Sequence, residues 1–390
     1  MRSARQTADY DVVIVGARCA GAAAAMLLAR QGLRVLAIDR GRYGSDTLST
    51  HALMRGAVLQ LHRWGVLPEV QRAGTPLVRR TTFFYDGDAV SIPIKPRDGV
   101  EGLCAPRRTV LDRILVDAAI ESGATVRHDT RLVRLLRSSS GRVCGVIVDH
   151  DNTGEQRITA DLVVGADGMR STVAKLVAAQ TYRTGRHACG TVYAHYLGIE
   201  SDGYEWHYRQ GAGAGVIPSN DGTACVFVAL PAARFAPEFR GSVAAGYHRV
   251  LSAVAPDLAS AVSRAEPAGS LHGFAGQTGF FRQSWGPGWA LVGDAGYFKD
   301  PFTAHGITDA FRDAELLAAS AARGLDNVAE YQRTRDEMSE EVFEVTDDIA
   351  SFSWDMPRLR VLHQQLADAM AAEVKSMSRF EERPLQLASA

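Results

Sequence analysis

At 390 residues the chain is long enough for two or three domains around a substantial core. Its 43 Lys and Arg residues against 44 Asp and Glu residues give a formal net charge of −1, which leaves no basic field for nucleic acid and favours a small-molecule partner. The five cysteines are scattered without a C-x-x-C pair, so we predict neither a metal site nor a redox disulfide, and reduced thiols indicate a cytoplasmic protein.

Residues 1–9 are expected to form a disordered leader. The apolar run that follows could be mistaken for a signal or membrane segment, but Asp9, Asp11 and Arg18 interrupt it. No other stretch could span a bilayer, so we predict no membrane span.

Residues 11–40 predict a strand, a glycine turn, a helix and a second strand. Residues 12–15 are a β-branched run typical of a buried parallel strand, and Gly16 ends it. Residues 17–30 are rich in Ala, Met and Leu without Pro, and Gly32 suits the left-handed end of a helix. Two parallel strands joined by one helix form a right-handed unit whose turn presents free N–H groups, where a diphosphate binds.

The spacing in this turn is typical of a dinucleotide site. Gly16 and Gly21 match the first and third glycines of G-x-G-x-x-G. Asp39 lies 23 positions after Gly16, close to the roughly 20 positions expected for a ribose-binding acid. Arg18 replaces the second glycine, and its guanidinium could pair with a phosphate. The alternative is an ordinary doubly wound domain with a tight turn.

The next region predicts a covering loop and the beginning of a second sheet. Residues 40–50 are a Gly/Ser/Thr-rich loop expected to lie over the cofactor, and His51 opens a predicted helix over 51–64 as a capping or partly exposed histidine rather than a catalytic one. Residues 81–85 and 89–94 flank Asp-Gly-Asp, which indicates a hairpin. A helix is predicted from Pro106 to before Gly123, and residues 127–160 predict a small β-meander.

Residues 161–172 form a second glycine-rich strand-to-helix turn, which carries Asp167 and Gly168. Residues 181–271 alternate between polar and apolar positions, as antiparallel strands do, and residues 242–262 predict helices across that sheet. Gly211, Gly213 and Gly215 imitate a dinucleotide loop, but the proline that follows excludes a helix there, so we reject a second nucleotide site.

Residues 289–317 form the third block of this kind. A buried strand over 290–292 ends in Gly293-Asp294-Ala295, and a helix begins near Gly306 after a turn at Pro301. Asp294 lies at a strand end, where a carboxylate could hold a sugar-alcohol hydroxyl. After residue 326 the chain is predicted to be helical to its end, with a division near residues 355–357.

These three glycine-and-aspartate blocks, in this order, resemble the para-hydroxybenzoate hydroxylase fold of the group A flavoprotein monooxygenase superfamily, over residues 10 to about 320. Geranylgeranyl reductases and flavin-dependent halogenases share that superfamily. The resemblance implies an α/β fold class with three parts. They are an FAD-binding Rossmann-like (GR2-type) domain of residues 1–77, 103–180 and 272–325, an antiparallel β-sheet substrate domain of residues 78–102 and 181–271, and a C-terminal helical segment of residues 326–390.

The resemblance also implies which residues contact FAD. For the ADP half they are Gly16, Ala17, Arg18, Ala20, Gly21, Asp39 and Arg40. For the rest of the cofactor they are Arg108 in an R-x-x-L-D pattern, Asp167, Gly168, Gly293, Asp294, Ala295, Pro301, Gly306 and Ile307. Asp294 would bind the ribityl chain, and Asp167 with Gly168 belong to a motif tied to FAD and to contacts with NAD(P)H.

One departure falls near the chemistry. The family helix commonly begins P-x-x-G-Q-G-x-N, whereas here Pro301 leads into Ala-His305-Gly306-Ile-Thr. The positive end of this helix would favour an anionic reduced flavin by about 1 kcal/mol or more. His305 is a candidate catalytic residue at that point, and a structural role for it is the alternative.

The leading functional hypothesis is a monooxygenase (hydroxylase) of secondary metabolism that uses NAD(P)H and O2, through a flavin C4a-hydroperoxide kept from water, on an aromatic or polyketide-like small molecule. Tyr193 and His195 are candidates for deprotonating a phenol. The candidate pocket also includes the strand aromatics Phe83, Tyr85, Trp206 and Phe227, for which a core role is the alternative.

Three other functions stay open. The runner-up is an FAD-dependent reductase or dehydrogenase of the geranylgeranyl reductase type. A halogenase is disfavoured because the W-x-W-x-I-P signature of tryptophan halogenases is absent. A non-enzymatic binding protein is the third, because GDP-dissociation inhibitors share this architecture. We expect a monomer or a homodimer.

Overall fold

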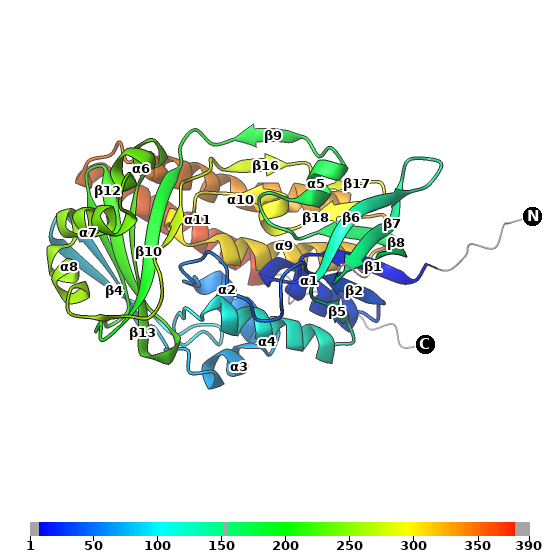
Figure 1. Cartoon of the computed structure of the whole chain (residues 1–390), viewed down its shortest axis with the longest axis horizontal. Coiled ribbons are helices and arrows are strands. Elements are labelled where there is room, and N and C mark those ends of the chain that lie inside the picture. Colours follow the sequence, from blue (N-terminus) through cyan, green and yellow to red (C-terminus); the bar gives the residue numbers. More distant parts are fainter. Residues whose placement is uncertain (1–7, 152–153, 379–390) are drawn as a thin grey trace, which may run out of the picture.

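The computed structural model describes residues 8–151 and 154–378, which form two large sheets joined by long helices (Figure 1). The first sheet has the order β17-β18-β8-β1-β2-β5, and β7 and β6 continue it from β8. Its strands are β1 Tyr10–Val15, β2 Val35–Ile38, β5 Thr125–Arg127, β6 Thr130–Arg137, β7 Val143–His150, β8 Glu155–Gly165, β17 Trp285–Gly286 and β18 Trp289–Leu291.

The centre of the first sheet is parallel. Val15 pairs with Gly165 of β8, and Gly165 pairs in turn with Leu291 of β18, while β2 lies between β1 and β5. Helices α1 (Cys19–Arg30) and α4 (Arg108–Glu121) pack together on one face, and α1 also packs against α9 (Gly306–Ala321). Because parallel strands all end at the same edge, the glycine turns after β1, β8 and β18 meet there.

The second sheet has the order β14-β10-β13-β12-β11-β3-β4, with β15 also paired to β10. Its strands are β3 Arg80–Tyr85, β4 Asp88–Pro93, β10 Cys189–Leu197, β11 Tyr204–Arg209, β12 Ala212–Pro218, β13 Thr223–Pro231, β14 Glu266–Pro267 and β15 His272–Phe274. All the pairs are antiparallel except β3 with β11.

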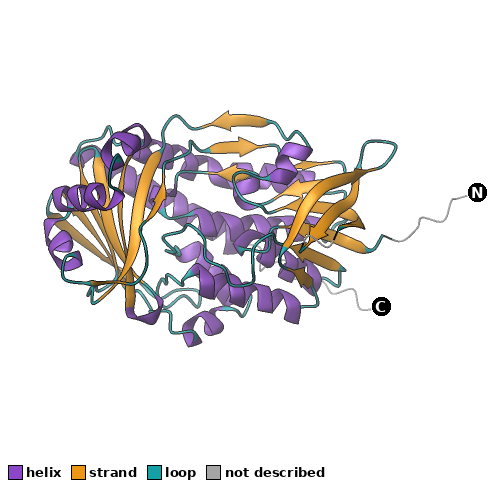
Figure 2. Ribbon diagram, in the orientation of Figure 1, coloured by secondary structure: helices purple, strands orange, loops and turns teal. Residues whose placement is uncertain are grey.

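Alternation along β10 gives this sheet two apolar faces. Val192 and Ala194 pack against Tyr247 and Leu251 of the outer helices, whereas Tyr193 belongs to the inner cluster. The outer helices are α6 Ala232–Phe239, α7 Val243–Val254 and α8 Pro256–Val262, at the left of Figure 2. The inner face meets the C-terminal helices, so both faces of the sheet are covered.

Helices α9, α10 (Ala329–Ala350) and α11 (Met356–Ser378) run lengthwise through the middle of the molecule in Figure 1. α10 packs against α9 and α11, and α11 reaches α2 (Arg55–Arg63), beside which lies α3 (Leu67–Arg72). The remaining elements are α5 Thr172–Leu176, the 3₁₀ turns Asn220–Gly222, Gly293–Ala295 and Pro301–Thr303, and a small sheet of β9 Thr181–Thr184, β16 Phe280–Arg282 and β19 Tyr297–Phe298.

The predicted α/β fold class is confirmed, with three local differences. Residues 156–164 form one strand rather than two. His51 does not open a helix, since α2 begins at Arg55, and the ring is 2% exposed rather than partly exposed. The predicted leader is wrong at Asp9, whose carboxylate accepts hydrogen bonds from Thr159 N and Oγ1 at 2.8 Å.

Two predictions fall partly beyond the described residues. Positions 1–7 of the expected leader and positions 379–390 of the expected helical segment lie outside them. Within residues 8–151 and 154–378, no helix has both the length and the apolar character needed to cross a membrane.

Candidate cofactor and substrate site

The three glycine turns converge, as the sequence predicted. Ala166 N donates to Val15 O at 2.7 Å, and Val292 N donates to Gly165 O at 2.9 Å, so the turns after β1, β8 and β18 are neighbours. A Cβ added to Gly293 would lie 3.0 Å from the Cβ of Ala20 in the first turn of α1. One ligand can therefore touch all three turns.

The first turn has the close backbone approach of a dinucleotide site. Gly16 has φ +102°, and a Cβ on Gly21 would lie 1.8 Å from Gly16 O, so the third glycine lets the helix pack on the turn. Helix α1 begins without a side-chain cap. Its first N–H groups and its positive end therefore suit a diphosphate.

Asp39 braces this turn from the end of β2. Its Oδ2 accepts from Ala17 N at 2.8 Å and its Oδ1 accepts from Gly41 N at 2.7 Å. Arg40, beside it, is exposed. Asp39 thus fixes the backbone of the first turn and of the start of the covering loop, beside the position predicted for a ribose.

Asp112 gathers two of the predicted arginines. The Arg18 guanidinium donates to Asp112 at 3.1 Å and to Ser45 O at 3.2 Å, so it ties the covering loop to α4. Arg108 makes a bidentate pair with the same carboxylate at 2.9 and 3.0 Å. Asp112 is the acid of the R-x-x-L-D pattern, to which the sequence analysis gave no role of its own, and it lies four residues after Arg108 on one helix face.

Asp294 is a carboxyl group without a protein partner. Within the described residues it makes no hydrogen bond or ion pair. Burial, followed by repulsion from Asp309, raises the pKa of Asp294 to about 7. A carboxyl group in this state can exchange hydrogen bonds with a sugar alcohol, which is the chemistry that a ribityl chain offers.

The second turn divides its two predicted residues between different roles. The Asp167 carboxylate accepts from Thr172 N at 2.6 Å and from Val173 N at 3.3 Å, and so caps α5. Gly168 has φ +78°, and no atom lies within 4 Å of an added Cβ. Asp167 holds its own helix, and Gly168 faces open space.

The third turn leads to an uncapped helix. Pro301 opens a 3₁₀ turn, and α9 then begins at Gly306 without a side-chain cap. A Cβ on Gly306 would meet nothing within 4 Å, and Ile307 beside it is half-buried. The positive end of a 16-residue helix therefore faces free space next to Asp294.

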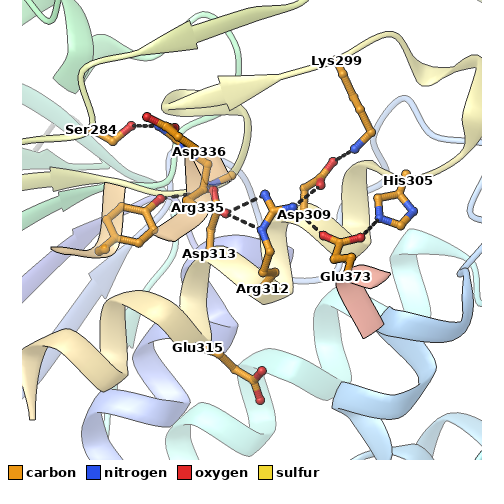
Figure 3. Close-up of polar contacts among 12 residues, drawn as sticks. Ser284, Lys299, His305, Asp309, Arg312, Asp313, Glu315, Arg335, Asp336 and Glu373 are labelled. Atoms are coloured by element: carbon orange, nitrogen blue, oxygen red, sulfur yellow. Dashed lines mark hydrogen bonds and ion pairs between the residues drawn. The ribbon is translucent and has the colours of Figure 1, made fainter. Parts of the chain in front are cut away.

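His305, just before α9, is held by a buried ion network (Figure 3). Glu373 of α11 contacts His305 Nε2 at 2.6 Å and Arg312 Nη1 at 2.6 Å. Arg312 also pairs with Asp309 at 2.8 Å and Asp313 at 2.9 Å. The Nδ1 atom of His305 is buried without a partner. Glu373 was not predicted, because nothing local marks a glutamate so far along the chain.

Part of this network has the composition of a metal site. His305, Asp309 and Glu373 bring ligand atoms within 4.8 Å of one another. The two carboxylates, however, already pair with Lys299 and Arg312. Cations of the protein therefore occupy the positions that a metal ion would need, and we assign the cluster to structure.

Two of the three candidate catalytic residues lie together, away from His305. Tyr193 and His195 share one face of β10, with rings 5.9 Å apart. Ser49 N donates to the Tyr193 hydroxyl at 3.0 Å, which joins the covering loop to the second sheet. The His195 ring lies 5.2 Å from that of His51, so His51, predicted from the sequence to be a capping or partly exposed histidine rather than a catalytic one, joins this group.

The predicted pocket aromatics form one buried cluster with the C-terminal helices. Phe83, Tyr85, Trp206 and Phe227 pack with side chains of α10 and α11. Tyr85 Oη lies 2.7 Å from His363 Nδ1 of α11. This face of the sheet is thus covered, and the part near Tyr193 meets the covering loop.

A shallow hollow lies at the opposite edge of the first sheet. It is lined by Tyr10, Val35 and Thr125, which stand at the amino ends of their strands. Ligands of open α/β sheets bind at the carboxyl ends, so we assign this hollow no role.

Together an uncapped α1, the unpartnered carboxyl group of Asp294 and an uncapped α9 gather at one edge of the first sheet. The chain belongs to the FAD binding domain family, whose model matches residues 9–346, and is an FAD-dependent oxidoreductase.

Two curated relatives are reductases. The chain is 28% identical over 334 residues to menaquinone reductase of Mycolicibacterium smegmatis, and this alignment covers 80% of this chain and 76% of the relative. It is 26% identical over 314 residues to digeranylgeranylglycerophospholipid reductase of Methanocella arvoryzae, with 79% and 76% covered.

Solved structures share the fold. The flavin-dependent brominase Bmp2 has a TM-score of 0.75 at 18% identity, covering 96% of this chain and 99% of that one. PqsL, a probable FAD-dependent monooxygenase from Pseudomonas aeruginosa, has a TM-score of 0.74 at 21% identity, covering 93% and 99%. These structures share the fold, and the family model over residues 9–346 confirms the superfamily that the sequence resembled.

Proposed function

We propose that this protein is an NAD(P)H- and O2-dependent FAD monooxygenase that hydroxylates an aromatic or polyketide-like small molecule. The observation that carries this proposal is the buried junction of aromatic and imidazole side chains between the covering loop and β10. Tyr193 is 5% exposed and His195 is 4% exposed there. Buried aromatic and imidazole side chains at this junction would suit a planar substrate and would keep water from the reaction.

The residues that would hold FAD are those predicted. Backbone N–H groups at residues 17–21 would take the diphosphate, and Asp39 would take the adenosine ribose. Asp294 would bind the ribityl chain, and the start of α9 at Gly306 would face the flavin ring. Bound FAD would carry electrons from NAD(P)H to O2 and supply the oxygen transfer.

Side chains around the substrate would act as neutral groups. Burial raises the pKa of Tyr193 to about 12, so the phenol keeps its proton at neutral pH. Burial, followed by the charge of Arg107, lowers the pKa of His195 to about 4, so its imidazole is uncharged. Both residues would therefore orient a substrate through hydrogen bonds, and a strong general base is not among their roles.

The test is the fate of molecular oxygen. The purified holoenzyme is supplied with NADH or NADPH, ¹⁸O2 and a panel of aromatic and polyketide-like compounds. We expect O2 consumption coupled to a product that carries one ¹⁸O atom, detected by mass spectrometry. Product formation at a full rate without O2 would refute the monooxygenase.

A second candidate is a reductase that moves a hydride to or from a carbon–carbon bond. The two reductases, each aligned over about three quarters of its length, favour it. The same experiment separates the two, because a reductase forms its product anaerobically and incorporates no ¹⁸O. A product that forms only in the presence of halide would indicate a halogenase. Failure of the purified protein to bind added FAD would indicate a non-enzymatic binding protein.

The proposal also covers the cellular setting, the substrate domain and the oligomeric state of the protein. The five free cysteines favour a reducing, cytoplasmic setting. We further propose that residues 78–102 and 181–271 act as the substrate domain and that the protein is a monomer or a homodimer. Size-exclusion chromatography with light scattering tests the oligomeric state.

A further inference from the structure

A pair of histidines closes the junction between the two sheets. His51 lies in the loop between β2 and α2, and His195 lies on β10. Their rings are 5.2 Å apart and inclined by 31°, and the residues are 2% and 4% exposed. Residues far apart in the chain are thus brought into ring contact away from water.

Three nitrogen atoms of this pair are left unbonded. Both ring nitrogens of His51 and Nε2 of His195 are buried without a hydrogen-bond partner. Leaving a buried polar atom unpaired costs about 1–3 kcal/mol, and native proteins rarely accept that cost without a reason. A ligand that pairs with these atoms would recover it.

The charge state limits which ligand fits. Burial, with the neighbouring His195 and then Arg108, lowers the pKa of His51 well below its ordinary value, so the ring is neutral at pH 7. A neutral imidazole presents one N–H donor and one lone-pair acceptor. The matching group must accept one hydrogen bond and donate another, and a hydroxyl group does both.

The backbone at His51 is strained in a way that favours a functional position. His51 has φ +69°, a conformation that costs a side-chain-bearing residue free energy and persists only when its surroundings impose it. Here Ser49 imposes it, since its Oγ accepts from His51 N at 3.0 Å and its own N donates to the Tyr193 hydroxyl at 3.0 Å. The covering loop is thereby fixed with the imidazole directed at β10.

The pair also lies near the cofactor position. Arg108 exerts an electrostatic effect on both His51 and Asp294. The Tyr193 ring lies 5.9 Å from that of His195 and also stacks on His272 at 5.3 Å. A ligand held by the two histidines would therefore have aromatic side chains beside it.

We propose that His51 and His195 form a two-imidazole anchor for a hydroxyl group of the substrate, in which one imidazole N–H donates a hydrogen bond to the hydroxyl oxygen and the lone pair of the other imidazole accepts a hydrogen bond from the hydroxyl O–H. The anchor selects phenols or stable enols over ethers and unsubstituted rings. This inference deepens the proposed function and rests on it for the statement that the ligand is the substrate.

The test is binding to the holoenzyme without turnover. Dissociation constants for 2-naphthol and 2-methoxynaphthalene are measured by equilibrium dialysis without reductant, in the parent, His195→Phe, His51→Gly and the control His248→Phe. His195→Phe keeps the ring shape, His51→Gly suits the positive φ, and His248 is exposed on outer helix α7.

In the parent we expect the naphthol to bind about tenfold more tightly than its ether, since two neutral hydrogen bonds contribute about that factor. Each of His195→Phe and His51→Gly removes one of the two hydrogen bonds and should lower this ratio to about three, whereas His248→Phe leaves it unchanged. A parent ratio near one, or an unchanged ratio in both anchor variants, overturns the anchor. Failure to incorporate ¹⁸O would refute the monooxygenase alone, because no chemistry enters the binding ratio.

Discussion

Replacing Glu373 by glutamine tests the ion network that joins the last helix to the start of α9. The side chain of Glu373 is fully buried and contacts His305 and Arg312 at 2.6 Å each. Glutamine keeps the shape but removes the negative charge, which leaves the buried Arg312 short of one carboxylate. Removing one partner of a buried ion pair costs about 3–5 kcal/mol.

This cost can be converted into a melting temperature. A chain of 390 residues has an unfolding entropy of about 0.8 kcal/mol per kelvin, so a loss of about 3–5 kcal/mol lowers Tm by about 4–6 °C. Thermal denaturation followed by circular dichroism measures the shift. The matched control is Asp368→Asn on the same helix, an exposed carboxylate that accepts a hydrogen bond from Gln364 Nε2 at 3.0 Å, for which we expect a loss of less than about 0.5 kcal/mol.

The pH dependence gives a second check. Although burial acts to raise it, the charges of His305 and Arg312 lower the pKa of Glu373 far below its ordinary value of 4.5. The stabilisation by the ionised carboxylate is therefore fully present above pH 4.5 and is lost as the pH falls further. The Tm gap between parent and Glu373→Gln should be constant from pH 6 to 8 and shrink in acid. Equal stability at pH 7 would refute the reasoning.

Four further predictions concern the cofactor site. Asp294→Ala should abolish stoichiometric FAD binding, measured by flavin absorbance, and retained FAD would contradict its role. Because the pKa of Asp294 is raised to about 7, its ionised form destabilises the apoprotein. The Asp294→Asn apoprotein should therefore have a higher Tm than the parent at pH 8 and an equal Tm below about pH 4. A lower Tm of the variant at pH 8 would contradict this destabilisation. Gly21→Ala should lower the free energy of unfolding by about 1–3 kcal/mol and abolish FAD binding, because the added Cβ would lie 1.8 Å from Gly16 O. The control Gly32→Ala, whose Cβ would meet nothing within 4 Å, should still bind FAD. Calorimetry of both variants measures stability and binding. Asp112→Asn should loosen the covering loop and raise the Kd for FAD in titrations of the apoprotein, and an unchanged Kd would count against it.

Local patterns were enough to predict much of the fold. The β-branched run before Gly16, the helix formers after it and the left-handed Gly32 depend on neighbours in sequence, and the structure has each of them in place. The convergence of three turns also followed from sequence, because parallel strands bring their carboxyl ends to one edge. Asp167 was located correctly, yet its hydrogen bonds are spent on α5, which spacing alone does not reveal.

What the sequence by itself determined is the cofactor-binding half: strand, turn and helix propensities act over a few residues, and they specify where backbone N–H groups and Asp294 stand. Only the tertiary structure decided the partners of His305 and His51. Glu373 reaches His305 through the packing of α11, and His195 reaches His51 across the junction of two sheets. Such pairings depend on how distant helices and strands pack and on which charges that packing buries together, and no local sequence pattern encodes them.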